Sequence, residues 1–196
     1  TLFLPNVTSY TTTGSYASPT IQASGDGSRV DLRNVNVLQG ATSISRINIA
    51  ALDGGVVDLR SLPQIIHGPV SLTSDGPDSL IDLSALATFS TAQSTYESGL
   101  AVANGGEVHL ASSAVDLNRV DIVLESGGIL RGGELRLAAT IALSGSGTIA
   151  AADNDDHGHM TWTEARGAGV MHCEQSDLDF TPATPSYGGS TTVSDD

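Results

Sequence analysis

Lysine is absent from this chain of 196 residues, and all eight of its basic residues are arginines. The 22 acidic residues therefore outweigh the basic ones and give a net charge of −14 at pH 7. A surface this acidic repels phosphate backbones and anionic lipid headgroups, so a nucleic-acid partner is not expected. Long apolar runs are absent too: none approaches the ~20 residues that span a bilayer, so membrane insertion is not expected.

Cysteine is equally scarce. Cys173 is the only cysteine, so no disulfide can form within the chain. We interpret it as a small buried thiol, with an intermolecular bridge or a metal ligand as the alternatives. The chain starts at Thr1 without a signal peptide, which indicates a processed protein or an excised fragment. Its many glycine, serine and threonine residues are typical of an extracellular β-rich protein, so we expect a secreted or cell-surface location.

A short apolar–polar–apolar triplet recurs along the chain at spacings of 27, 24, 27 and 27 residues. Its five copies are Val30-Asp31-Leu32, Val57-Asp58-Leu59, Ile81-Asp82-Leu83, Val108-His109-Leu110 and Leu135-Arg136-Leu137. A second triplet precedes each copy: Ile21-Gln22-Ala23, Ile47-Asn48-Ile49, Val70-Ser71-Leu72, Leu100-Ala101-Val102 and Ile122-Val123-Leu124. Alternation with a period of two predicts strands that bury one face, and the glycines between the triplets supply tight corners.

A third apolar leg follows each second strand, for example at Val35 and Val37. Three strands and three corners within 24 to 27 residues match one coil of a parallel β-helix. We therefore predict an all-β fold, a single-stranded parallel β-solenoid of about five coils stacked ~4.8 Å apart. The solenoid body would occupy residues 20–152, between an N-terminal cap (1–19) and a C-terminal cap (153–180), with a linker-like tail at 181–196. A leucine-rich repeat and an antiparallel sandwich or barrel are the weaker alternatives.

One coil is longer than the others. Its first-strand spacing is 30 residues, against 23 and 22 on either side, and the extra residues fall within 88–98. Insertions in solenoids emerge as loops, often on the binding face. Near-helical spacing makes a short helix over the core the alternative for Leu86, Phe89, Gln93 and Tyr96.

The triplets and their glycine corners resemble repeats of bacterial extracellular β-solenoids, such as filamentous adhesins and autotransporter passengers, in the broad pectate-lyase-like class. The resemblance covers about residues 20–150 and is architectural, because no catalytic signature accompanies it. Proteins of this class include adhesins, stalk modules, and polysaccharide lyases and hydrolases. The fold alone does not choose among them.

The first candidate site is a ladder of carboxylates formed by Asp31, Asp58 and Asp82. Stacked triplets would direct these side chains outward on neighbouring coils, roughly 5 Å apart. Arg33 and Arg60 lie two residues further on, hence on the same face, and can neutralise the row without a metal. We interpret the row as a solvated structural ladder. Calcium ligands, or the acid/base pair of a lyase or hydrolase, are the alternatives.

The second candidate site is a late cluster of aspartates and histidines. The aspartates would suit calcium, and the histidines with the neighbouring cysteine would suit copper or zinc. The spacing matches no established zinc motif, so a solvent-exposed loop of the C-terminal cap is the favoured interpretation. The candidate metal ligands are Asp153, Asp155, Asp156, His157, His159 and His172.

The sequence favours a non-enzymatic structural or adhesive module of a secreted or cell-surface bacterial protein. Its partners would be other modules of the same parent chain, or surface polysaccharide. This hypothesis requires no cofactor. The alternatives are a carbohydrate-active β-helix, acting as a polysaccharide lyase, glycoside hydrolase or binding module, and an extracellular module that binds calcium or a transition metal through the late cluster.

Overall fold

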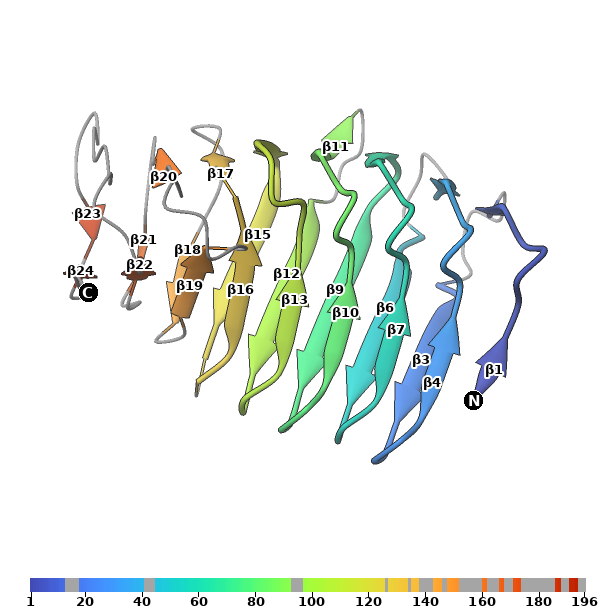
Figure 1. The fold of residues 1–196 in the computed structure, drawn as a ribbon. Helices are drawn as coiled ribbons and strands as arrows, with labels where there is room; N and C mark the ends of the chain where they lie inside the picture. Colours follow the sequence, from blue (N-terminus) through green and yellow to red (C-terminus); the bar gives the residue numbers. More distant parts are fainter. Residues whose placement is uncertain are drawn as a thin grey trace.

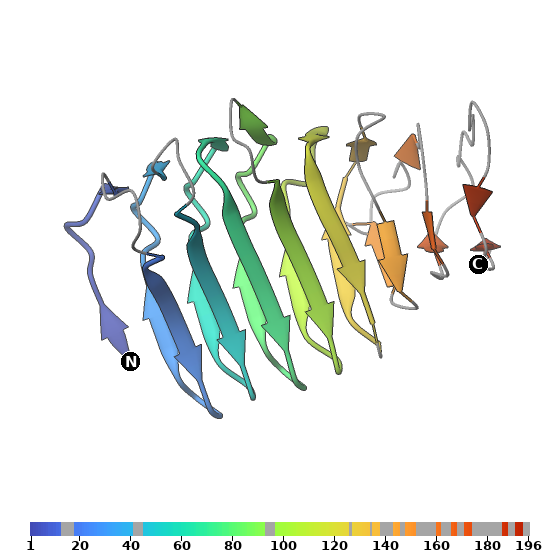
Figure 2. The ribbon, with the colours of Figure 1, turned by 180° about the vertical axis from the view of Figure 1, so that it is seen from behind.

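The computed structural model describes residues 1–12, 18–40, 45–92, 97–125, 127–133, 135–137, 143–145 and 148–151. It also describes short strands at 160–161, 166–167, 171–173, 186–187 and 191–193, and it describes side chains as far as residue 133. No helix occurs within these ranges, and strands follow one another along the long axis of the molecule (Figure 1). The same ladder is seen from behind in Figure 2.

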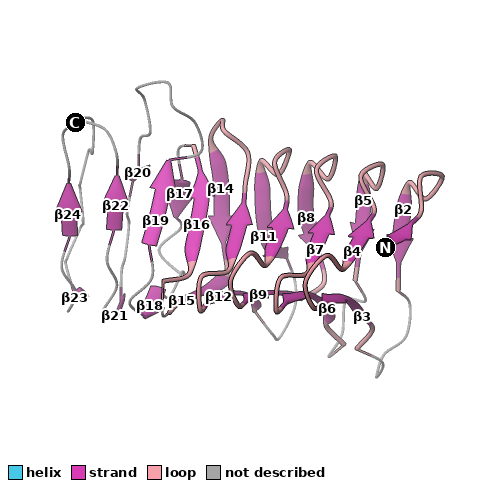
Figure 3. Ribbon diagram, turned by 60° about the horizontal axis from the view of Figure 1, so that its bottom comes forward, coloured by secondary structure: helices cyan, strands magenta, loops and turns pink. Residues whose placement is uncertain are grey.

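Three parallel sheets form the legs of the solenoid. The seven-stranded sheet contains β1 (Leu2–Phe3), β4 (Arg29–Asp31), β7 (Val56–Asp58), β10 (Leu80–Asp82), β13 (Glu107–His109), β16 (Ile129–Gly132) and β19 (Thr148–Ala151). The six-stranded sheet contains β3 (Thr20–Ser24), β6 (Ile47–Leu52), β9 (Val70–Asp75), β12 (Ser98–Ala103), β15 (Val120–Leu124) and β18 (Leu143–Gly145). Figure 3 shows the loops that join this sheet to its neighbours.

The five-stranded sheet completes each turn. It contains β8 (Gln64–His67), β11 (Thr88–Ala92), β14 (Val115–Asn118), β17 (Leu135–Leu137) and β20 (Met160–Thr161). A separate parallel pair, β2 (Ser9–Thr11) with β5 (Val37–Gln39), continues towards it through a backbone bond of 3.0 Å from Gly40 N–H to the His67 carbonyl. Two further pairs are β21 (Arg166–Gly167) with β23 (Ser186–Tyr187), and β22 (Met171–Cys173) with β24 (Thr191–Val193).

Each strand pairs in parallel with the strand one turn later, so Val57 lies between Val30 and Ile81 in the seven-stranded sheet. The prediction of an all-β parallel solenoid is confirmed. About four turns, from β3 to β14, are described together with their side chains. Residues 1–12 add β1 and β2 in the same parallel arrangement, against β4 and β5. The predicted boundaries of the caps and tail stay predictions.

The core lies on the axis shared by the three sheets. Strands β6, β9 and β12 alternate strictly between buried and half-buried residues, because successive side chains of a strand point to opposite faces. The predicted inward rows are buried as far as the described side chains reach, and they include Val30, Leu32, Val57, Leu59, Ile81, Leu83, Val108 and Leu110. Fully burying one such side chain stabilises the fold by about 1.5–3 kcal/mol.

The corner after the seven-stranded sheet places every third residue in the core. In one turn Leu32, Val35 and Leu38 are all buried, and the Val35 N–H donates to the Leu32 carbonyl at 2.9 Å. The next two turns repeat this spacing with Leu59, Leu62 and Ile65, then with Leu83, Leu86 and Phe89. Our expectation that Val37 faces inward is wrong: it is 46% exposed, because the tight turn shifts the inward position to Leu38.

The corner before the seven-stranded sheet requires glycine because the turns approach closely there. A Cβ on Gly55 would lie 2.3 Å from the carbonyl oxygen of Ala23 in the preceding turn. A Cβ on Gly106 or Gly128 would meet a backbone oxygen at 2.5 or 2.2 Å. These contacts are too short for any side chain, so the glycines permit the spacing between turns.

Two register assignments made from the triplets are wrong. Leu135-Arg136-Leu137 pairs with β14 in the five-stranded sheet, and the fifth full strand of the seven-stranded row is Ile129–Gly132. In the six-stranded sheet Ile21 pairs with Ile49, two residues from the expected position. A slip of two residues keeps the same face buried, so alternation alone does not reveal it.

The long coil contains a strand where a helix was the alternative. Phe89 lies in β11 and is fully buried, and Leu86 is buried in the preceding corner. The helical alternative is therefore wrong for the described residues of this coil. Gln93 and Tyr96 lie outside the described residues.

Candidate functional site

Most charged side chains with described contacts lie on the outer surface of the seven-stranded sheet. We call the outward positions of β4, β7, β10, β13 and β16 the charged face. The register aligns one row as Asp31, Asp58, Asp82, His109 and Arg131. The neighbouring row is Arg29, Val56, Leu80, Glu107 and Ile129. Three acidic residues are thus followed by two basic residues in one row, and each group has a counter-charge nearby.

The aspartates of the predicted ladder shape the corner that follows each strand. The Oδ1 atoms of Asp31 and Asp58 each accept the backbone N–H two residues ahead, both at 3.3 Å. Asp82 does the same with the Ser84 N–H at 3.1 Å. This is the Asx-turn, in which a side chain replaces a backbone acceptor. Three consecutive turns therefore use the same carboxylate to fix the same bend.

Arginines cover the first two carboxylates. Arg33 Nε donates to Asp31 Oδ1 at 2.9 Å, and Arg60 Nε donates to Asp58 Oδ1 at 2.8 Å. Arg29 reaches across to Asp58 in the next turn, and Arg60 lies 3.5 Å from Asp82 Oδ2. The expected neutralisation by Asp–Arg pairs is present, but the expected solvation of the ladder is wrong. Asp31 is 3% exposed and Asp58 is fully buried, because the arginine side chains lie over them.

The electrostatic environment keeps these carboxylates ionised. The hydrogen bond from Arg33 is the main reason that the pKa of Asp31 falls from 3.8 to about 2. Burial alone would raise the pKa of Asp58, but hydrogen bonds from Arg60 and Arg29 outweigh it and hold that pKa below its ordinary value. A buried carboxylate is tolerated only when it is paired and hydrogen-bonded in this way.

We expect the free energy of unfolding to fall between about pH 5 and pH 2. A carboxyl whose pKa is lower in the folded state than in the unfolded state binds fewer protons when folded. Its stabilisation is complete above the unfolded pKa and is lost as the pH falls through the folded pKa. Urea unfolding followed across this range measures the loss. Asp31→Asn should make the decline shallower, and an unchanged decline in this variant would contradict the role given to Asp31.

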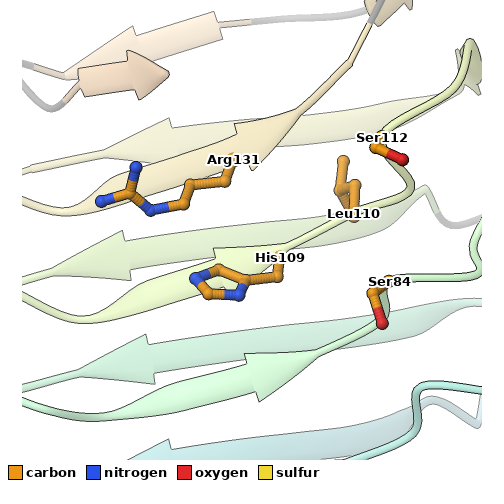
Figure 4. Close-up of a pocket in the computed structure, with 5 residues that line it drawn as sticks. All are labelled: Ser84, His109, Leu110, Ser112 and Arg131. Carbon is orange, nitrogen blue, oxygen red and sulfur yellow. The ribbon is translucent and has the colours of Figure 1, made fainter. Parts of the chain in front are cut away.

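A pocket of about 140 Å³ opens further along the charged face (Figure 4). Its lining residues come from three successive turns: Ser84, His109, Leu110, Ser112 and Arg131. Figure 4 shows His109 and Arg131 extending from their strands on one side, with Ser84 and Ser112 on the corner at the other. The pocket therefore combines two basic side chains with two hydroxyl groups.

Glu107 holds the two basic side chains in place. His109 Nε2 lies 2.7 Å from Glu107 Oε2, and Arg131 Nε donates to the same oxygen at 3.1 Å. Burial would raise the pKa of Glu107, but the hydrogen bonds from His109 and Arg131 outweigh it and lower that pKa. All four carboxylates described on the charged face thus accept hydrogen bonds.

Sequence reasoning identified the aspartates and two of the arginines, but it missed Arg29, Glu107 and Arg131. Arg29 and Glu107 precede an outward residue by two positions, so their presence on this face could have been read from the alternation. Arg131 could not, because its place beside His109 depends on the register of β16.

The predicted metal ligands Asp153, Asp155, Asp156, His157 and His159 lie outside the described residues. His172 lies in β22, as does Cys173, and only their backbone is described. Within the described residues, no group of three or more His, Cys, Asp or Glu side chains is arranged to hold a metal ion. The late metal site and the buried thiol stay predictions.

The fold and the charged face define the class of protein: an all-β parallel solenoid with an ion-paired outer sheet. The chain matches no protein-family model, no curated protein and no solved structure. The likeness to adhesins, autotransporter passengers and pectate-lyase-like proteins therefore rests on architecture alone. A separate finding is that the described residues contain no helix long and apolar enough to cross a membrane.

Proposed function

We propose that this chain is a non-enzymatic structural or adhesive module of a secreted or cell-surface bacterial protein. The observation that carries the proposal is the engagement of the outward carboxylates by arginines and backbone N–H groups. A general acid or base must exchange its proton near the working pH. The low pKa of Asp31 and the buried ion pairs of Asp58 do not suit that task.

The stacking of the turns supports a role as a rigid spacer. Parallel strands of successive turns lie ~4.8 Å apart, and each turn buries the apolar side chains of the turn before it. The acidic, lysine-free composition favours solubility and separation from other acidic surfaces. The proposed partners are other modules of the same parent chain or surface polysaccharide.

A second candidate function is a carbohydrate-active β-helix, and the pocket between Ser84, His109 and Arg131 is the observation that favours it. Hydroxyl, imidazole and guanidinium groups can all bind sugar hydroxyls, and Glu107 lies beside them. The pocket measures about 140 Å³. Ligand pockets usually enclose roughly 300–1,000 Å³, so its size favours the structural proposal.

The experiment compares the native chain with a variant that lacks residues 47–69, which is one turn in register because Ile47 pairs with Val70. A spacer should fold without this turn and become shorter by about 4.8 Å, as measured between spin labels at the two ends. Neither chain should release products from a panel of neutral and acidic polysaccharides.

Enzymatic turnover would contradict the proposal. The decisive result would be product formation by the native chain that Glu107→Gln abolishes and Glu125→Gln preserves. Glu125 is the matched control because it is exposed and does not line the pocket. A deletion variant that does not fold would contradict the modular stacking of the turns.

A further inference from the structure

The N-terminal end of the solenoid has an incomplete turn among the described residues. Its first strand, β1, pairs with β4, and its second, β2, pairs with β5. The six-stranded sheet ends at β3, so within the described ranges no strand pairs with the edge of β3 that faces away from β6. A strand edge of this kind presents backbone N–H and C=O groups to any chain that can pair with them.

An apolar pocket lies at the position where the third leg of this turn would run. It measures about 390 Å³, and its lining includes Leu2, Leu4, Tyr10, Ile21 and Val30. By comparison, an engineered apolar cavity of about 150 Å³ accommodates a benzene molecule. This pocket is therefore large enough to accept apolar side chains from outside.

The pocket continues an interface that every later turn fills. Ile21 pairs with Ile49, and Ile49 pairs with Leu72, in one inward row of the six-stranded sheet. Ile49 and Leu72 are fully buried between neighbouring turns, whereas Ile21 at the end of the row is only partly buried. Leu2 occupies an inward position opposite Val30 but is 53% exposed. These residues have the packing surface of a core without the strand that would cover it.

We propose that the N-terminal end binds one extended strand of a partner polypeptide, parallel to β3, with alternate apolar side chains directed into the pocket between Leu2, Tyr10 and Ile21. Backbone hydrogen bonds to β3 would supply affinity, and the apolar lining would select partners with apolar residues at every second position. Charged residues at those positions would be rejected, because the pocket offers few polar groups to pair with them. The proposal is independent of the spacer function.

A grafted strand tests the proposal in the intact chain. Leu2 aligns with Val30, which aligns through Val57 with Ile81, so Thr1 corresponds to Leu80. A second copy of residues 70–79 placed directly before Thr1 therefore positions the β9 sequence beside β3. The control graft carries aspartate in place of Val70 and Leu72, the inward residues of that strand.

The matching graft should raise the melting temperature by about 5 °C over the control graft. It should also slow amide hydrogen exchange in Thr20–Ser24, and a free peptide of residues 69–79 added to the native chain should slow the same amides. Equal melting temperatures and equal exchange for the two grafts would overturn the proposal. So would a native chain that self-associates and already protects these amides, because a second copy would then occupy the edge.

Discussion

Leu83→Asp is expected to abolish the folded state. Leu83 is fully buried, and its N–H donates to the His109 carbonyl of the next turn at 2.8 Å. Aspartate at this position would place an unpaired charge in the core and remove the contacts of a large apolar side chain. The cost should exceed about 4 kcal/mol, which is comparable with the 5–15 kcal/mol that stabilises a typical domain. Circular dichroism during thermal unfolding measures the loss.

Ala85→Asp is the matched control, because Ala85 is exposed in the same corner, two residues further on. Surface substitutions of this kind usually change stability by less than about 0.5 kcal/mol. The control should therefore melt close to the native chain. If Leu83→Asp also melted at the native temperature, the inward orientation of this row would be wrong.

Gly55→Ala is the substitution with the second largest expected effect, although it adds only one methyl group. The new Cβ would lie 2.3 Å from the carbonyl oxygen of Ala23, and both groups belong to backbone that cannot rotate away. The two turns would have to separate, which would weaken the 2.8 Å bond between Val56 N–H and the Ser28 carbonyl. We expect a loss of about 3 kcal/mol or more in chemical denaturation.

Gly27→Ala separates this steric effect from backbone strain. Gly27 has a positive φ of 71°, but a Cβ there would meet nothing within 4 Å. The control should therefore cost only the ~1 kcal/mol of a left-handed residue with a side chain. A Gly55→Ala variant no less stable than Gly27→Ala would show that the turns are not in close contact at this corner.

The sequence predicts which residues of the solenoid face inward, because alternation is a local property of each strand. It does not predict which leg a triplet belongs to: Leu135-Arg136-Leu137 has the same pattern as the triplets of the seven-stranded sheet but lies in the five-stranded one. Register is also undetermined, since Ile21 could pair with Ile47 or Ile49 without exposing either residue. Both questions depend on the lengths of the corners, and alternation contains no information about them.

The candidate site shows the same division between local and non-local information. The Asx-turns of Asp58 and Asp82 depend on residues two positions apart, so their sequence neighbours suffice to explain them. The burial of Asp58 depends on Arg29, which comes from the preceding turn and covers it only when the strands are in register. An aspartate is ordinarily exposed, so residue type alone gave the wrong expectation.

The arginine contacts have a consequence for survival in a protease-rich exterior. Trypsin-like enzymes cleave after lysine or arginine, and this chain offers them no lysine. Every arginine whose side chain is described takes part in an ion pair or a hydrogen bond: Arg29, Arg33, Arg46, Arg60, Arg119 and Arg131. Cleavage at these positions requires a turn to detach and the arginine to leave its partner, so the ladder that fixes the corners also withholds the scissile residues from digestion.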